Sequence, residues 1–348
     1  THRQRSFEPV DSSQPSQMPR CHNDTRPWAA FLVVGHARTF VLEAVARDML
    51  SNAIRSFEAH AATFFVLSDD DHGSTKAHEK VHNSERAVAA AAATFKPVAF
   101  RYDAIDSARP RVPKDCALQR ELNGSSTLGS YASDQPWLLA WWQTWDRLRS
   151  AFQLVVAHEA AREMRFDWVV RLRPDAWFFL PGFAYCQLDP AEGVFSPSGI
   201  AGCHGPCMND HLAWVPRAHA EAYFAAAAAE LEGCHDADLF RKRMRDYGSF
   251  LYSRLRRLRV PIARARLVPY TLARPCASFA SNGSAVADCN RMGHDADKHP
   301  KGAERLPTTN EPNRTTLNTL VAECIARWRW PAGVPLGGAQ RPSFMKVC

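Results

Sequence analysis

Short apolar segments that alternate with helix-patterned segments constrain the fold of this chain more than any other feature. The apolar runs are residues 30–34, closed by Gly35, and residues 63–67 and 97–100; residues 168–173, which carry two arginines, are expected to form a further strand. Runs that are apolar throughout are typical of strands buried on both faces. Helical patterns over 39–58, in the Ala-rich stretch after Asp71 and over 134–165 separate these strands. We therefore expect an α/β fold with a mainly parallel sheet flanked by helices.

The segment 134–165 carries the strongest helical pattern. Pro136 suits the first turn of a helix. Apolar residues follow at helical spacing: Leu138, Trp141, Trp142, Trp145, Leu148, Phe152, Val155 and Val156. We interpret this tryptophan-rich stripe as core packing rather than as a platform for stacking sugars.

The composition along the chain predicts three parts. Residues 1–27 are rich in Ser, Pro, Gln and Arg and are expected to form a flexible stem, pinned at Cys21. Residues 28–290 are expected to form one catalytic domain, with a nucleotide-sugar half at 28–180 and an acceptor half at 181–290. Within the acceptor half we expect a strand end near 195–199, helices over 217–232 and 238–259, and a strand near 267–270. Residues 291–348 are expected to form a polar loop, a helix over 317–329 and a tail packed on the domain.

Cysteine usage and glycosylation sequons indicate an oxidising compartment. The chain has ten cysteines and four Asn-x-Ser/Thr sequons, at Asn23, Asn123, Asn282 and Asn313. We expect the lumen of the secretory pathway, Golgi or ER, with any signal peptide or type II anchor upstream of Thr1. Cys203 and Cys207 form the only tight pair, and a local disulfide is favoured over zinc because a second ligand pair is missing.

The net charge of +7 does not indicate nucleic-acid binding. The arginines are scattered, apart from runs at 241–245 and 254–259 that fit the polar face of a helix. A basic cleft for a diphosphate, or an acidic acceptor, remains compatible with this charge. No apolar run reaches the length needed to span a bilayer.

Polar residues follow three of the predicted strands directly. Ligands of open α/β sheets bind beyond the carboxyl ends of the strands, so these residues are the first candidates for a site. They are Gly35-His36-Ala37-Arg38, Ser68-Asp69-Asp70-Asp71 and Arg173-Pro174-Asp175.

The segment Phe166–Phe178, with its Arg171-x-Arg173-Pro174-Asp175 core, resembles glycosyltransferases of the GT-A superfamily. It is most similar to algal, plant and bacterial sets that carry an RxRPD segment where GT-A enzymes have a metal-binding DxD motif. Three other stretches support the resemblance: Phe31–Phe40, whose GxxRT end lies near the nucleotide in such enzymes; Asn209–Ala213 with Arg217 and Tyr223-Phe224, similar to an acceptor-side segment; and Phe250–Ile262. The related pattern usually has a Glu where this chain has Gly248 or Asp246.

The resemblance implies transfer of a sugar from a nucleotide-sugar donor, expected to be a UDP-sugar, to a glycan or glycoprotein hydroxyl. Gly35, His36, Arg38, Arg171 and Arg173 are the expected donor-binding residues. Asp175 is expected near the diphosphate as a catalytic residue and metal ligand, and Asp210 is the candidate general base or acceptor-orienting carboxylate. Because Arg173 stands in place of the first Asp, dependence on Mn²⁺ or Mg²⁺ is in doubt, and the arginines are candidates to neutralise the diphosphate instead.

Less specific roles stay open for the same residues. Asp175 could cap the turn after its strand, Arg171 could pair with Asp167, and Asp210 could be an Asx-turn residue. Three rival acidic motifs are present: Asp69-Asp70-Asp71 could bind metal or form a loop, Asp236-Ala237-Asp238 is favoured as a helix cap, and Asp295-Ala296-Asp297 lies in the polar loop.

Two other function classes remain open. One is a catalytically inactive lumenal domain that binds glycan or protein, and the other is a sulfotransferase. The sulfotransferase is disfavoured because Gly35–Thr39 is too short for its phosphate loop and lacks a lysine.

Overall fold

The computed structural model describes residues 21, 25–37, 40–41, 43–69, 83–103, 135–178, 181–197, 208–209, 211–226, 228–229, 247–265 and 270–272. Several sequence predictions fall outside these residues. They are the predictions for Arg38, Asp70, Asp71, Cys203, Cys207, Asp210, the acidic motifs at 236–238 and 295–297, the helix over 317–329, and the segments 1–20 and 273–348.

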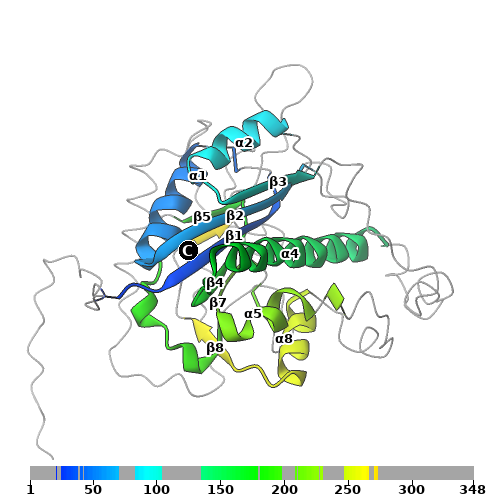
Figure 1. Ribbon diagram of the computed structural model, residues 1–348. Helices are drawn as coiled ribbons and strands as arrows, with labels where there is room; N and C mark the ends of the chain where they lie inside the picture. The colour runs from blue at the N-terminus through cyan, green and yellow to red at the C-terminus, as the bar shows by residue number, and fades with distance from the viewer. Residues whose placement is uncertain are drawn as a thin grey trace, which may run out of the picture.

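A seven-stranded sheet with the order β3-β2-β1-β4-β7-β6-β8 forms the centre of the described fold (Figure 1). Its strands are β1 Trp28–His36, β2 His60–Ser68, β3 Ala99–Asp103, β4 Trp168–Leu172, β6 Val194–Pro197, β7 Leu212–Pro216 and β8 Ile262–Ala265. β1 is parallel to β2 and β4, β2 to β3, and β6 to β8, whereas β7 is antiparallel to β4 and β6. The predicted α/β fold with a mainly parallel sheet is confirmed.

Helices cover both faces of this sheet. α4 Gln135–Arg162, α5 Arg217–Phe224 and α8 Tyr247–Arg257 pack on one face. α1 Glu43–Met49, the π turn Leu50–Ile54, the 3-10 turn Arg55–Phe57 and α2 Glu85–Ala93 cover the other (Figure 1). A two-stranded antiparallel sheet of β5 Ala176–Phe178 and β9 Tyr270–Leu272, with short 3-10 turns at Tyr185–Gln187 and Pro190–Glu192, completes the described elements.

The alternation of side chains along β1 explains its continuous apolar sequence. Ala30, Leu32 and Val34 belong to the core under α4, and Phe31 and Val33 belong to the core under α1. Both faces of the strand are therefore buried, as the apolar run predicts. Trp145, Leu148, Phe152 and Val155 of α4 are also buried, so the core-packing interpretation is confirmed for this part of the stripe.

The structure differs from the sequence predictions in one helix, which is divided into three shorter pieces, and in three short strands that were not predicted. The segment expected as one helix over 39–58 instead contains α1, a π turn and a 3-10 turn, and Glu58 ends it with φ 59°. β5, β7 and β8 were not predicted; β5 and β8, with three and four residues, are too short for periodicity to identify.

Cys21 is linked by a disulfide to Cys186, in the 3-10 turn Tyr185–Gln187. The Cys21 amide also donates to Glu58 Oε2 at 3.0 Å. This covalent link ties Cys21 to the described fold, and it joins positions 165 residues apart. The predicted stem before Cys21 lies outside the described residues.

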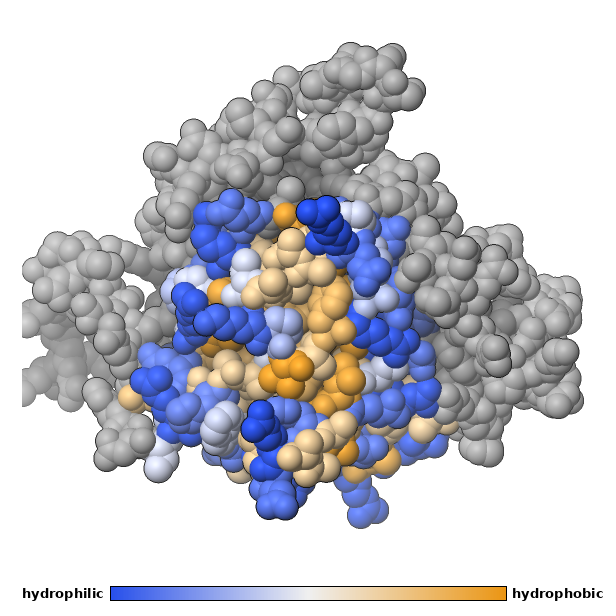
Figure 2. Space-filling view, turned by 45° about the horizontal axis from the view of Figure 1, so that its top comes forward, coloured by the Kyte–Doolittle hydropathy of each residue, from blue (hydrophilic) through white to orange (hydrophobic). Residues whose placement is uncertain are grey.

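Among the described residues, only Trp28, Val98, Val156 and Leu258 are exposed large apolar residues. Figure 2 shows one face of the molecule on which apolar side chains form a band bordered by polar and charged ones. No helix in the described part of the chain is long and apolar enough to cross a membrane.

An ion pair joins the end of α4 to the start of α5. Arg217 donates from Nε and Nη2 to the two carboxylate oxygens of Glu159 at 2.8 and 2.7 Å, and the Phe166 amide donates to Oε1 at 3.0 Å. The Arg217 guanidinium also lies over the Phe152 ring, 5.1 Å from its centre. Burial raises the pKa of Glu159, but the hydrogen bonds from Arg217 and Phe166 outweigh it, and the net pKa is lowered.

We expect Glu159→Gln to remove a pH-dependent part of the stability. Because the folded pKa of Glu159 lies below the unfolded one, its contribution is present above the ordinary glutamate pKa and is lost as the pH falls toward the lowered value. Urea unfolding at pH 7 should show the variant less stable by about 2 kcal/mol. The difference between wild type and variant should shrink as the pH is lowered through this range. A difference that is constant with pH would contradict the assignment.

Candidate site at the switch point of the sheet

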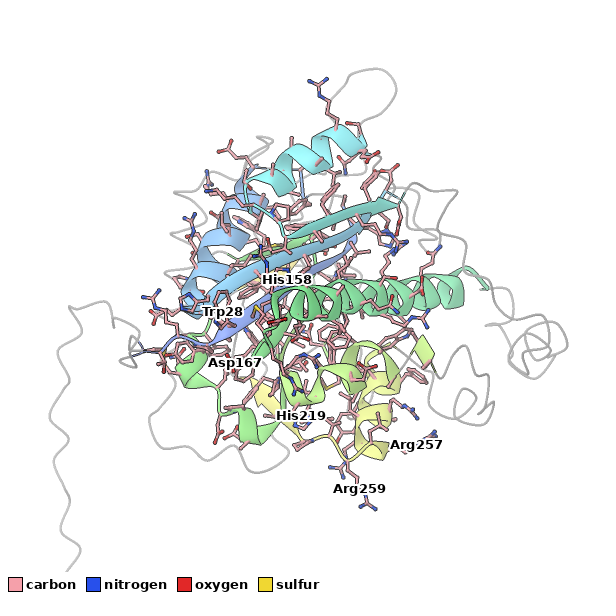
Figure 3. All side chains as sticks on the ribbon, in the orientation of Figure 1. Trp28, His158, Asp167, His219, Arg257 and Arg259 are labelled. Atoms are coloured by element: carbon pink, nitrogen blue, oxygen red, sulfur yellow. A yellow bond between two sulfur atoms is a disulfide. The ribbon has the colours of Figure 1, made fainter. Side chains whose placement is uncertain are left out.

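The order of the strands defines one switch point in this sheet. From β1 the chain moves outward through β2 and β3 on one side, and then returns to place β4 on the other side of β1. In open α/β sheets the crevice beyond the carboxyl ends of two such strands is the usual ligand site. Trp28 and Asp167 mark the opposite, amino ends of β1 and β4 (Figure 3).

The carboxyl ends of β1 and β4 meet through Gly35 and Pro174. Gly35 has φ 142°, which favours glycine, and a Cβ at this position would lie 3.2 Å from Cδ of Pro174. Next to it, His36 Nδ1 lies 3.1 Å from Ser68 Oγ, and the Ala37 amide donates to the Ser68 carbonyl at 2.8 Å. The structure therefore brings the predicted residues Gly35 and His36 together with the Arg173-Pro174-Asp175 segment.

Arg173 and Asp175 form a bidentate ion pair at this edge. Arg173 donates from Nε to Oδ1 at 2.8 Å and from Nη2 to Oδ2 at 2.7 Å. The side chain of Asp175 is 2% exposed and that of Arg173 is 18% exposed. The carboxylate therefore fixes the guanidinium beside the end of β4.

The described residues do not fit a divalent cation at Asp175. Both carboxylate oxygens accept from Arg173, so a cation of the chain itself already compensates this charge. Within the described ranges, no three His, Cys, Asp or Glu side chains are grouped in a way that could hold a metal ion. The Arg173 guanidinium is charged at every accessible pH.

Arg171 lies on the helix-covered face of β4 rather than at the strand end. Its side chain is 2% exposed, and Nη1 donates to Tyr223 Oη of α5 at 3.5 Å. The alternative pairing with Asp167 is wrong: Asp167 Oδ2 instead accepts from the Trp28 amide at 2.8 Å. A direct role of Arg171 in donor binding would need this buried side chain to become accessible.

Polar residues also lie at the carboxyl ends of β2 and β3, on the same edge of the sheet as Arg173 and Asp175. Asp69 Oδ1 accepts from the Asn83 amide at 2.7 Å, and Tyr102 Oη donates to the Asn83 carbonyl at 2.7 Å. Burial and then the neighbouring Asp69 raise the pKa of Tyr102 to about 12, so the phenol stays protonated and keeps donating. Asp69, considered above as a metal or loop residue, has a structural partner here.

The start of β7 reaches the switch point from the other side. The Arg173 amide donates to the His211 carbonyl at 2.9 Å, so His211 is the direct neighbour of Arg173. Asn209 is buried and lies beside Tyr270 of β9, as does His211. Sequence reasoning missed Tyr270, because only the pairing of β5 with β9 brings this distant residue to the edge. Asp210, the predicted base between these two residues, lies outside the described positions.

Gly248, at the start of α8, packs against the backbone of Met208, just before Asn209. Met208 donates its amide to the Gly248 carbonyl at 3.1 Å, and a Cβ at Gly248 would overlap the Met208 carbonyl oxygen. The glycine thus allows this close approach of the two backbones. We expect Gly248→Ala to cost about 1–3 kcal/mol in urea unfolding, because the backbone must shift. A change below about 0.5 kcal/mol would contradict this contact.

Comparisons with known proteins give structural matches only. No protein-family model matches the sequence, and no curated protein matches it either. The glycosyltransferase GlyE of Streptococcus pneumoniae TIGR4 aligns at 10% identity and TM-score 0.30, over 70% of this chain and 45% of GlyE. The galactosyltransferase LgtC, solved with donor and acceptor sugar analogues, aligns at 10% identity and TM-score 0.29, over 68% of this chain and 73% of LgtC. Mouse xyloside xylosyltransferase 1 aligns at 12% identity and TM-score 0.32, over 70% of this chain and 85% of that protein.

Proposed function

We propose that this chain is a glycosyltransferase that moves a sugar from a nucleotide-sugar donor to a hydroxyl of a glycan or glycoprotein. The observation that carries the proposal is the Arg173–Asp175 pair at the carboxyl end of β4, beside Gly35 and His36 of β1. The switch point is where an α/β sheet of this order is expected to bind a nucleotide. The RxRPD segment that resembles GT-A glycosyltransferases supplies the charged pair at that place.

The chemistry needs the negative charge of the leaving diphosphate to be stabilised. Arginine binds phosphate oxygens with a rigid fork of donors, and Asp175 accepts from Nε and Nη2 of this guanidinium. Asp175 then acts by orienting Arg173 rather than by binding metal, and no step depends on a metal ion. His36, near the end of β1, is the second proposed contact to the donor, and Arg38 remains a further candidate from the sequence.

The proposal also includes the cellular compartment of the protein and the donor and acceptor that it uses. The Cys21–Cys186 disulfide fits an oxidising environment, which supports the secretory lumen expected from the sequons. The acceptor would be a glycan or glycoprotein, the donor a UDP-sugar, and no nucleic acid is involved. A catalytically inactive glycan- or protein-binding domain is the second candidate, supported by the replacement of the first Asp of the DxD motif by Arg173.

The experiment is a turnover assay with a panel of UDP-, GDP- and CMP-sugars. Free nucleotide is measured with and without added glycan acceptors, in Mn²⁺ and in EDTA. We expect one donor class to release nucleotide, with comparable rates in Mn²⁺ and in EDTA. Arg173→Lys should lower the rate at least about tenfold, because lysine cannot replace the bidentate fork. Nucleotide binding without release from any donor would favour the inactive binding domain, and a strict requirement for Mn²⁺ would contradict the role given to Arg173.

A further inference from the structure

An exposed cluster of arginines lies at the end of α8. Residues 256–259, with the sequence Arg-Arg-Leu-Arg, span the end of the helix and the turn that follows, and all four are exposed. The flanking residues Leu255 and Val260 are buried in the core under α4. Figure 3 shows Arg257 and Arg259 pointing away from the sheet. We call residues 256–259 the arginine tip.

The backbone of the arginine tip closes the helix in a Schellman motif. The Val260 amide donates to the Leu255 carbonyl at 2.9 Å, and the Arg259 amide donates to the Arg256 carbonyl at 3.1 Å. Arg259 occupies the left-handed position of this motif, with φ 57°, where glycine is preferred because an L side chain crowds the backbone. The helix dipole favours cations within the last turn, but its effect falls off beyond that turn. The charge of Arg259 is therefore held at the surface at a conformational cost.

The arginine tip lies at the opposite edge of the sheet from Arg173 and Asp175. α8 begins beside Met208, at the edge where β6 ends and β7 starts. Beyond the tip, the Pro261 carbonyl accepts from the Val194 amide at 2.9 Å, at the start of β6. Because β7 is antiparallel to both β4 and β6, the start of β6 lies on the side of the amino end of β4. The tip is therefore separate from the candidate site.

The charge of the arginine tip selects an anionic partner. Guanidinium groups bind sulfate, phosphate and carboxylate groups through a fork of donors. The tip offers three arginines and one exposed apolar residue, Leu258, which is 41% exposed. This surface is small for a specific nucleic-acid interface and lacks the broad apolar face that holds a helix in a membrane. A flexible acidic polysaccharide fits it better, because a few charged groups of such a polymer suffice to cover it.

We propose that the arginine tip is a docking site for an acidic glycan, one that carries sulfate or carboxylate groups. Arg256 and Arg259 are its central contacts, because the hydrogen bond between their backbones holds them one turn apart. Docking at this edge leaves the candidate site open, so the docked glycan need not be the acceptor of the proposed transfer. The inference goes beyond the proposed function and does not depend on it.

The test measures binding of a fluorescent heparin oligosaccharide, a sulfated glycan, to the full chain by anisotropy. Wild type is compared with Arg256→Ala/Arg259→Gly and with the control Arg55→Ala/Arg86→Ala. The control removes the same charge from exposed positions on the elements that cover the other face of the sheet. The dissociation constant should rise about tenfold or more in the tip variant, because charge-assisted contacts are lost, and stay near the wild-type value in the control.

The single variant Arg259→Gly separates binding from a structural role. It should bind heparin more weakly than wild type, while its urea midpoint stays equal or rises because glycine fits φ 57°. A lower urea midpoint with unchanged heparin binding would show a structural role and overturn the inference.

Three results with the other proteins would also overturn the inference. They are no heparin binding by wild type, an equal loss of affinity in the control variant, and tighter binding of wild type to phosphatidylserine vesicles or to an oligonucleotide at the same ionic strength. None of these measurements requires turnover of a nucleotide sugar. Failure of the proposed function would therefore leave the inference standing, and failure of the inference would leave the proposed function standing.

Discussion

Asp175→Ala is expected to lower the free energy of unfolding by about 3 kcal/mol, because it leaves a largely buried guanidinium without its carboxylate. The Asp175 side chain is 2% exposed and both of its oxygens bind Arg173. Removing either partner of such a pair strands the other charge in a medium that solvates it poorly. Urea unfolding at pH 7 measures the loss, and Arg173→Ala should cost a similar amount.

The chain contains a matched control for this prediction. Arg101 and Asp103 have the same spacing at the carboxyl end of β3, with 2.7 Å between Nε and Oδ1, but the Arg101 side chain is 51% exposed. Asp103→Ala should therefore cost only about 0.5–1 kcal/mol. A double-mutant cycle on each pair separates the coupling from the other effects of the substitutions. Equal coupling energies in the two cycles would contradict the buried role of Asp175.

Cys186→Ser is expected to have the largest effect on stability of any single change. The Cys21–Cys186 bond closes a loop between positions 165 residues apart, and loop-closure entropy gives an upper value of about 5 kcal/mol for such a loop. The loss should appear as a lower urea midpoint at pH 7 under non-reducing conditions. The Glu58 contact to the Cys21 amide would be lost with it, because that amide would no longer be held in place.

The double variant Cys21→Ser/Cys186→Ser distinguishes loss of the bond from damage caused by a free thiol. If the account is correct, the double variant is about as stable as Cys186→Ser, since the same covalent link is absent in both. A cost below about 1 kcal/mol would show that the disulfide contributes little to the unfolding equilibrium. A double variant close to wild type would indicate that the unpaired Cys21 thiol, and not the missing bond, destabilises the single variant.

The central sheet could be predicted from the sequence because its main strands are buried on both faces. The sequences of β1 and β2 are continuous apolar runs for that reason, and the long helix α4 has apolar residues at helical spacing. β7 could not be predicted in the same way. It has five residues and ends at Pro216, and its antiparallel place between β4 and β6 depends on contacts distant in sequence.

The candidate site was predictable where its residues directly follow a strand. Gly35 and His36 end β1 and Arg173–Asp175 directly follow β4, so the general rule for parallel sheets locates them. Arg171 was expected at the site from the resemblance and not from this rule; its side chain lies within β4 and contacts Tyr223 on a sheet face. Tyr270 carries no local signal, since β9 pairs with β5 across almost a hundred residues of sequence.

The most direct test of the central claim is a thermal-shift measurement of nucleotide binding at the switch point. UDP, GDP and CMP are added to wild type, Arg173→Lys and the matched control Arg101→Lys. At a hundred times the dissociation constant, one nucleotide should stabilise wild type and Arg101→Lys by about 2.7 kcal/mol. The same concentration should stabilise Arg173→Lys clearly less. No shift with any nucleotide in wild type, or an equal shift in Arg173→Lys, would contradict the claim that this edge of the sheet binds a nucleotide diphosphate.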